Sequence, residues 1–153
     1  MTSGTTCAST DLTVRSGKWR TIYAGGYTPA VTGLAKVDVS GCWVYQYIAP
    51  TYHGNTGSVD IKVSNTVIES TNTISAIFAG PINKNKILGD ATITLGENVA
   101  VQAVYASARN TGNINGTATI IADGVNLSET PVYAKYSEAT GTTTMAVLQV
   151  NEG

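Results

Sequence analysis

Residues 58–63 read Ser-Val-Asp-Ile-Lys-Val, an uninterrupted alternation of polar and apolar side chains. Successive side chains of a β-strand point to opposite faces, so the two valines and the isoleucine fall on one face of such a strand. The same alternation returns in residues 90–95 and 98–105. Turn-forming Gly, Asn, Asp and Ser residues separate these runs, and no segment with a helical period lies between them. The sequence therefore predicts sheets with one buried and one solvated face.

This pattern predicts a single all-β domain, an antiparallel β-sandwich of jelly-roll type with about nine or ten strands. The domain is expected to span residues 18–153, without an internal repeat. Ser64-Asn65 and Gly96-Glu97 are expected to be the turns of two β-hairpins. Residues 1–17 form a polar segment, which is either an arm that orders only on docking or a disordered terminus. The segments from which these strands are expected are residues 18–23, 34–39, 42–49, 58–63, 66–69, 73–79, 90–95, 98–106, 116–122, 132–136 and 143–150, eleven candidates in all.

The composition is apolar and poor in charge. The chain of 153 residues is 42% hydrophobic and 12% charged, against about 25% charged residues in an ordinary soluble domain. Charged side chains usually protect exposed sheet edges, so either partner subunits cover much of the surface or the chain is a monomer rich in surface Thr, Ser and Asn. The net charge of −1 argues against a nucleic-acid partner. No apolar stretch reaches the roughly 20 residues that span a bilayer, so no membrane partner is expected.

The sequence contains no catalytic constellation, so we expect the protein not to be an enzyme and to need no cofactor. His53, the single histidine, lies in a Gly/Asn/Thr-rich stretch and is expected to be an exposed loop residue. Asp123-Gly124 lacks the neighbouring acidic residues of a calcium loop and is expected to be a turn. Cys7 and Cys42 lack metal or redox spacing and are expected to be free thiols. No metal site is therefore expected.

Four segments carry a resemblance to a known family. They are the glycine-opened aromatic strand at residues 41–47, the strand and turn at 59–66, the pattern Thr-Ile-Thr-Leu-Gly-Glu-Asn-Val-Ala-Val-Gln-Ala-Val-Tyr at 92–105, and the closing strand at 144–150. In this order they resemble the trimeric jelly-roll domain shared by the complement C1q and tumour-necrosis-factor families, a domain that also occurs in bacteriophage virion proteins. The resemblance covers roughly two thirds of the chain, from Gly33 onward.

The resemblance implies a homotrimer whose threefold axis is lined by one face of the inner sheet. That face would combine aromatic and small apolar side chains from two strands. The candidates are Trp43, Tyr45, Tyr47, Val101, Ala103 and Tyr105. The same residues could equally form intramolecular core, because rigid aromatic side chains bury much area at little entropic cost in either setting.

A second interpretation of the aromatic residues is a platform on which sugar rings stack, as in carbohydrate-binding modules. Its members would be Trp43, Tyr45, Tyr47 and Tyr52. The first three share one face of their strand, while Val44, Gln46 and Ile48 occupy the other. Both faces then look covered, which favours burial or a subunit interface over an open platform.

Together these observations lead us to expect a non-enzymatic structural protein of a virus particle, namely a bacteriophage capsid decoration or head-fibre protein. Its partners would be its own copies in the trimer and the capsid or tail proteins to which the polar N-terminal segment attaches. The alternative is a glycan- or receptor-binding β-sandwich module, such as a fibre tip or an adhesin. Residues 1–6 have neither the basic nor the apolar region of a secretory signal, so we expect synthesis in the host cytoplasm and location in the virion.

Overall fold

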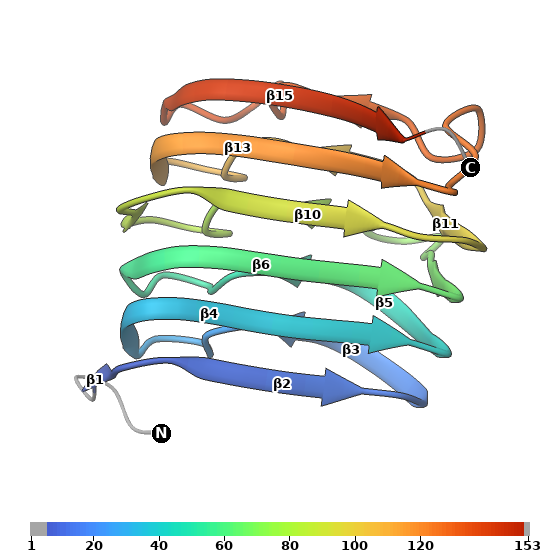
Figure 1. Ribbon diagram of the computed structural model, residues 1–153, viewed down its shortest axis with the longest axis horizontal. Coiled ribbons are helices and arrows are strands. Elements are labelled where there is room, and N and C mark those ends of the chain that lie inside the picture. The colour runs from blue at the N-terminus through green and yellow to red at the C-terminus, as the bar shows by residue number, and fades with distance from the viewer. Residues whose placement is uncertain (1–5, 152–153) are drawn as a thin grey trace.

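The computed structural model describes residues 6–151, which form a β-solenoid of parallel strands without a helix in that range (Figure 1). The strands make two sheets. Sheet A contains β1 (Thr6–Cys7), β2 (Thr10–Val14), β4 (Ala30–Ser40), β6 (Thr56–Ser64), β9 (Lys86–Ile87), β10 (Ala91–Leu95), β13 (Asn113–Asp123) and β15 (Thr143–Asn151). Sheet B contains β3 (Gly17–Tyr23), β5 (Cys42–Ala49), β7 (Thr66–Ile68), β8 (Ala76–Phe78), β11 (Val99–Val101), β12 (Ala103–Tyr105) and β14 (Val132–Tyr133).

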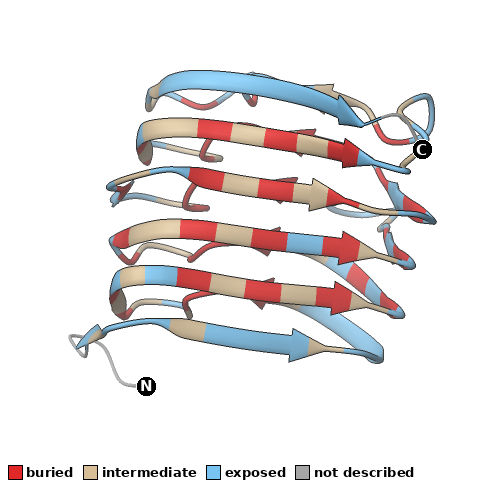
Figure 2. Cartoon of the chain, in the orientation of Figure 1, coloured by how far each residue is buried: buried red, intermediate tan, exposed pale blue. Residues whose placement is uncertain are grey.

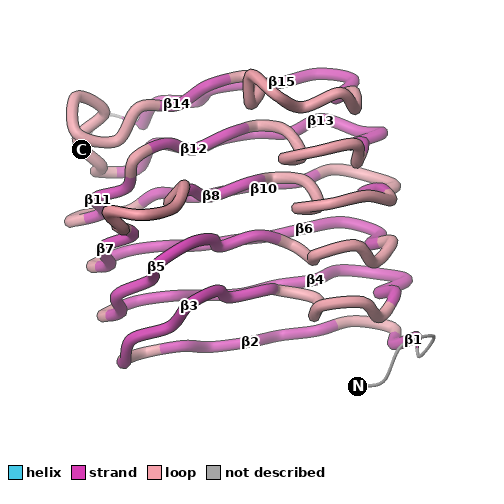
Figure 3. Tube along the Cα trace, turned by 180° about the vertical axis from the view of Figure 1, so that it is seen from behind, coloured by secondary structure: helices cyan, strands magenta, loops and turns pink. Residues whose placement is uncertain are grey.

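The chain alternates between the two sheets, and we call one passage through sheet A and then sheet B a rung. Figure 3, seen from behind, shows the strands of sheet B and the loops that return the chain to sheet A. Every strand pairing among the described residues is parallel, because each strand pairs with strands of the rungs before and after it. The coil is right-handed (Figure 1), the hand that connections between parallel strands almost always take.

Every second residue of sheet A points toward sheet B, and these residues align in columns along the coil. Val37, Ile61, Ile93 and Ile120 occupy one column on four successive rungs, and all four side chains are fully buried. Figure 2 shows the resulting alternation of buried and more exposed positions along the inner strands. The all-β class predicted from the sequence is confirmed.

One residue with a left-handed backbone lies where each of the first five rungs turns from sheet A into sheet B. These residues are Gly17, Gly41, Asn65, Asn98 and Gly124, with φ angles between 47° and 106°. Glycine adopts positive φ freely, and asparagine tolerates it better than most residues. The side-chain amide of Asn98 also donates a hydrogen bond to Oδ1 of Asn65 at 3.0 Å, which links two consecutive corners.

The predicted antiparallel jelly-roll sandwich is wrong, and so are its two hairpins. The strands on either side of Asn65 do not pair with each other: β6 lies between β4 and β10 in sheet A, and β7 lies between β5 and β11 in sheet B. The strands β10 and β11, which flank residues 96–98, are separated in the same way. A two-residue type I′ hairpin needs positive φ at both central residues, and each of these corners has a single such residue. The chain therefore bends into the other sheet instead of reversing.

The repeat is irregular in length, which hides it in the sequence. The steps from Val37 to Ile61, from Ile61 to Ile93 and from Ile93 to Ile120 are 24, 32 and 27 residues. The longest step includes a loop between β7 and β8 and another between β8 and β10. Repeats of roughly 20 to 50 residues are typical of solenoids. The coil is thus an internal repeat that the sequence analysis does not predict.

A column of glycines lies at the opposite corner, where the chain re-enters sheet A. Gly33, Gly57, Gly89 and Gly116 occupy it on successive rungs. The amide of Gly89 donates to the carbonyl oxygen of Gly57 at 2.7 Å, and the amide of Gly116 donates to that of Gly89 at 3.0 Å. A Cβ atom added at Gly57 would lie 2.4 Å from the carbonyl oxygen of Thr32. Glycine therefore permits a contact between rungs that a larger residue would prevent.

The segment predicted as an N-terminal arm lies partly outside the described residues, which begin at Thr6. Its described part contains β1 and β2, and both strands pair with β4. At the other end of the coil, β15 pairs with β13. The described part of the segment therefore contributes two strands to the first rung.

We expect Asn65→Val to lower the free energy of unfolding by about 1 to 2 kcal/mol, because a β-branched residue is strained at the positive φ of this corner. Asn65→Gly removes the same side chain but accepts the same backbone, and should change stability by no more than about 0.5 kcal/mol. Urea unfolding followed by circular dichroism measures both values. Equal stability of the two variants would contradict the role given to the corner.

Candidate functional site

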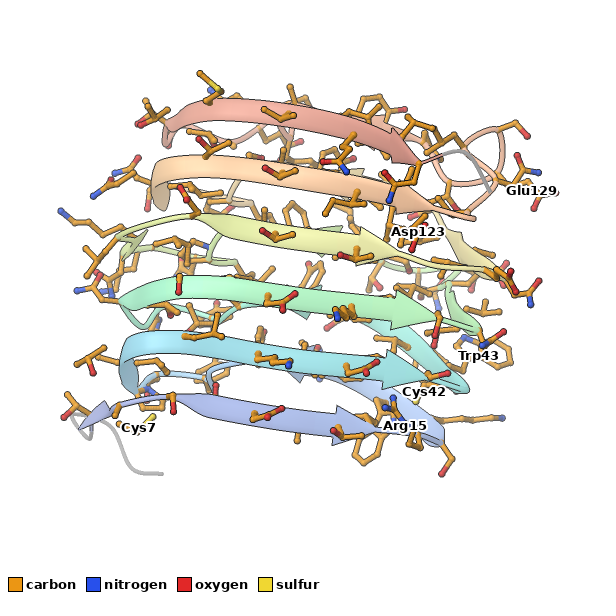
Figure 4. The ribbon with its side chains drawn as sticks, in the orientation of Figure 1. Cys7, Arg15, Cys42, Trp43, Asp123 and Glu129 are labelled. Atoms are coloured by element: carbon orange, nitrogen blue, oxygen red, sulfur yellow. The ribbon has the colours of Figure 1, made fainter. Side chains whose placement is uncertain are left out.

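The predicted aromatic face of β5 is open at one end and covered at the other. Trp43 and Tyr45 are 40% and 41% exposed, whereas Tyr47 is 9% exposed. Trp43 lies near the corner end of the strand, next to Cys42 (Figure 4). The guanidinium of Arg109 lies 5.6 Å from the ring of Tyr47, and that ring also packs edge-on against Phe78 of β8. The platform rejected from the sequence is therefore exposed at Trp43 and Tyr45.

The other three candidates do not share a face, because Gln102 interrupts the alternation between β11 and β12. Val101 packs in the core between the sheets. Ala103 is buried, and Tyr105 stacks on Phe78 with ring centroids 5.0 Å apart. Val101 and Tyr105 thus both make contacts within the chain.

A surface that we call the aromatic strip lies on the first two rungs, on strands β3 and β5 of sheet B and on the loops that follow them. Its members are Trp43, Tyr45, Tyr23, Tyr27 and Tyr52. The rings of Trp43 and Tyr45 have centroids 6.0 Å apart and planes inclined by 30°. Nε1 of Trp43 donates a hydrogen bond to the backbone carbonyl of Glu69 at 3.3 Å, and Nζ of Lys18 lies 5.2 Å from the Trp43 ring. These contacts hold the indole in place while leaving much of it exposed.

The three tyrosines of the strip line a pocket. Tyr27 and Tyr52 stack almost parallel, with ring centroids 4.4 Å apart and 4° between their planes. Tyr23 approaches both rings edge-on, at 5.9 Å and 6.5 Å between centroids. The pocket has a volume of about 470 Å³, within the range of small-molecule sites. Its other lining residues are Arg20, Thr21, Gln46 and Tyr47.

Polar groups of defined orientation border this pocket. Nε of Arg20 donates a hydrogen bond to Oε1 of Gln46 at 3.1 Å. Burial raises the pKa of the Tyr23 hydroxyl, and the neighbouring Tyr27 adds to the rise. The hydroxyl therefore stays protonated at neutral pH and can both donate and accept a hydrogen bond. Aromatic faces beside such groups suit a ligand with apolar faces and polar edges.

Two cations flank the strip without a carboxylate partner. The single ion pair among residues 6–151 joins Arg15 to Asp38 at 3.1 Å, on sheet A. The hydrogen bond that Arg15 donates to Asp38 holds the pKa of the Asp38 carboxyl below its ordinary value. Lys18 and Arg20 belong to β3 and make no ion pair within the described residues. Their charges are available to an anionic ligand.

No metal centre is assembled in the described part of the chain, where no three His, Cys, Asp or Glu side chains cluster. His53 lies beside the aromatic strip, with its ring 5.1 Å from that of Tyr52. It is half-buried rather than exposed as expected, and its Nδ1 has no hydrogen-bond partner.

Cys7 and Cys42 are free thiols. Across residues 6–151, no helix is long and apolar enough to cross a membrane.

Tyr23, Tyr27 and Arg20 are candidate functional residues that the sequence pattern does not indicate. The sequence does contain one indication of this pocket. Tyr27 and Tyr52 are 25 residues apart, almost the 24 residues that separate Val37 and Ile61 on successive rungs, so both tyrosines occupy equivalent positions of the repeat. Recognising it requires the rung repeat, which places the loops after β3 and β5 side by side.

Comparisons with known proteins found no match to the chain among protein-family models, curated proteins or solved structures.

Proposed function

We propose that this β-solenoid is a saccharide-binding protein and that the aromatic strip is its binding surface. The observation that carries the proposal is the exposed Trp43–Tyr45 pair beside the pocket of Tyr23, Tyr27 and Tyr52. A sugar ring has an apolar face of C–H groups and an edge of hydroxyls. The exposed aromatic rings would cover the apolar face of the sugar. The side chains of Arg20 and Gln46 would form hydrogen bonds with its hydroxyl groups.

The charge at the strip favours acidic saccharides over neutral ones. Lys18 and Arg20 lack carboxylate partners among the described residues and lie on the strand that borders the strip. A guanidinium binds a carboxylate through two parallel hydrogen bonds, which adds orientation as well as affinity. The ligand class proposed is therefore an oligosaccharide that carries carboxylates, such as a uronic acid polymer.

We expect Trp43→Ala and Tyr52→Ala each to weaken saccharide binding at least about tenfold, which corresponds to about 1.4 kcal/mol. Titration calorimetry with acidic and neutral oligosaccharides selected on a glycan array measures this loss. Tyr133→Ala is the matched control, because Tyr133 is 49% exposed but lies on a distant rung. A blank array, or an equal loss in the control, would overturn the proposal. Arg20→Gln should reduce the preference for acidic ligands, because the charge of Lys18 remains.

The virion role expected from the sequence stays a prediction. The jelly-roll fold on which it partly rested is wrong, because the strands are parallel and coil as a solenoid. The alternative function, a glycan-binding module, does not depend on that fold.

A further inference from the structure

The last strand of sheet A, β15, has an unprotected edge. It pairs with β13 along one side, and no strand of the described residues pairs with its other side. Its nine residues include neither a charged residue nor a proline. Met145, Leu148 and Val150 are 56%, 48% and 57% exposed, and Figure 2 shows the strand exposed along its length. Natural proteins usually protect such an edge with lysine, proline or a bulge.

The core is open beside the same strand. Ala146, Leu148 and Val150 continue the buried columns of β13, since they pair with Ala118, Ile120 and Ala122. On the sheet B side, the last strand of the described chain is β14, which is only two residues long. A cavity of about 170 Å³ lies here, lined by Ala106, Ile120, Val132, Tyr133, Leu148 and their neighbours. An apolar cross-section of the solenoid is therefore exposed to water.

The first rung differs from this end in both respects. Its β3 carries Lys18 and Arg20, and β2 carries Asp11, so charges guard the edge. Nε1 of Trp19 donates to the carbonyl of Ser16 at 2.9 Å, which fixes an aromatic side chain at that end. Two copies meeting through their first rungs would bring like charges together. The strand β15 itself carries no charged residue, so pairing through it brings no like charges together along the strand.

We propose that the occupant of the β15 edge is β15 of a second copy, paired antiparallel about a twofold axis at Val147. This register places Ala146 opposite the partner's Leu148. The core-facing side chains of one copy therefore lie next to the core-facing side chains of the other. Backbone groups of both edges gain hydrogen-bond partners, and the two open cross-sections cover each other. A twofold contact also closes, because each copy uses its one unguarded edge.

Stacking of β15 on the first rung of another copy is the competing arrangement. It would place the neutral edge of β15 against the charged edge and Trp19, and each copy would keep one free end. Such a contact does not close and yields filaments that lengthen with concentration. The two arrangements therefore differ in the mass that they produce.

Sedimentation equilibrium over about 1 to 200 µM tests the proposal, because association responds to concentration by mass action. We expect the mass to rise from 15.9 kDa to a plateau at twice that value. Val147→Lys places like charges at the twofold axis and should weaken the dimer at least about tenfold. Thr119→Lys is the control, since Thr119 pairs with Val147 from the neighbouring strand and also points outward. Circular dichroism verifies that both variants fold.

Three outcomes would overturn the dimer. They are a monomer at the highest concentration, a mass that grows without a plateau, and equal loss of association in both lysine variants. None of them bears on the aromatic strip, which belongs to the first two rungs.

Discussion

Replacing Ile93 with alanine is expected to lower the free energy of unfolding by about 3 to 4 kcal/mol. Ile93 is fully buried and lies in register between Ile61 and Ile120. The lost side chain leaves a cavity bordered by the rungs on both sides, and close pairing of the strands limits collapse into it. Equilibrium unfolding in urea, followed by circular dichroism, measures the change.

The control for this variant is Leu12→Ala, in the same column on the first rung. Leu12 is 40% exposed and has a neighbouring rung on one side only within the described chain, so the expected loss is below about 1 kcal/mol. If Ile93→Ala cost no more than Leu12→Ala, the columns would not be the source of stability.

Gly57→Ala is expected to destabilise the protein by about 3 kcal/mol through overpacking. The added Cβ would lie 2.4 Å from the carbonyl oxygen of Thr32 and 2.7 Å from that of Gly33. Both neighbours are backbone atoms, so no side-chain rotation relieves the contact. The rungs would have to separate at this corner, where the amide of Gly33 also donates to the carbonyl of Ala8.

Gly96→Ala provides the comparison for this glycine. Its added Cβ would lie 3.1 Å from Cβ of Ser64 and 3.5 Å from the carbonyl oxygen of Val63, which demands only a small shift. We expect a loss below about 1 kcal/mol, measured by the same urea unfolding. A similar loss in both variants would show that close approach of the rungs at Gly57 is not required.

The positions of several strands could be predicted from the sequence, but their partners could not. Residues 58–63 and 90–95 alternate because one face of each strand is buried, and they form most of β6 and β10. Alternation does not distinguish an antiparallel pair from a parallel one, because the side-chain period is two in both. The choice between antiparallel and parallel pairing depended on residues 64–65 and 96–97. These are turn-forming residues, which are common both in hairpins and at the corners of a solenoid. The backbone angle that separates them, one positive φ rather than two, is not visible in residue type.

The aromatic site was predictable only in part. Trp43 and Tyr45 could be assigned to one face from their spacing, and the structure places them there. The pocket required Tyr27 and Tyr52 to stack, and these lie in loops whose alignment depends on the coil. When rungs differ in length, the local sequence does not show which residues of one rung lie beside which residues of the next. The stacking of Tyr27 on Tyr52 therefore could not be predicted without the fold.

The aromatic strip and β15 lie at opposite ends of the coil. The strip occupies the first two rungs, and β15 lies four strands beyond β4 in sheet A. With strands about 4.8 Å apart, a twofold pair joined at β15 would hold its two strips roughly 40 Å from each other. Such a particle would be bivalent: it could engage two sites on one polysaccharide or cross-link two chains, and its avidity would exceed the affinity of either strip.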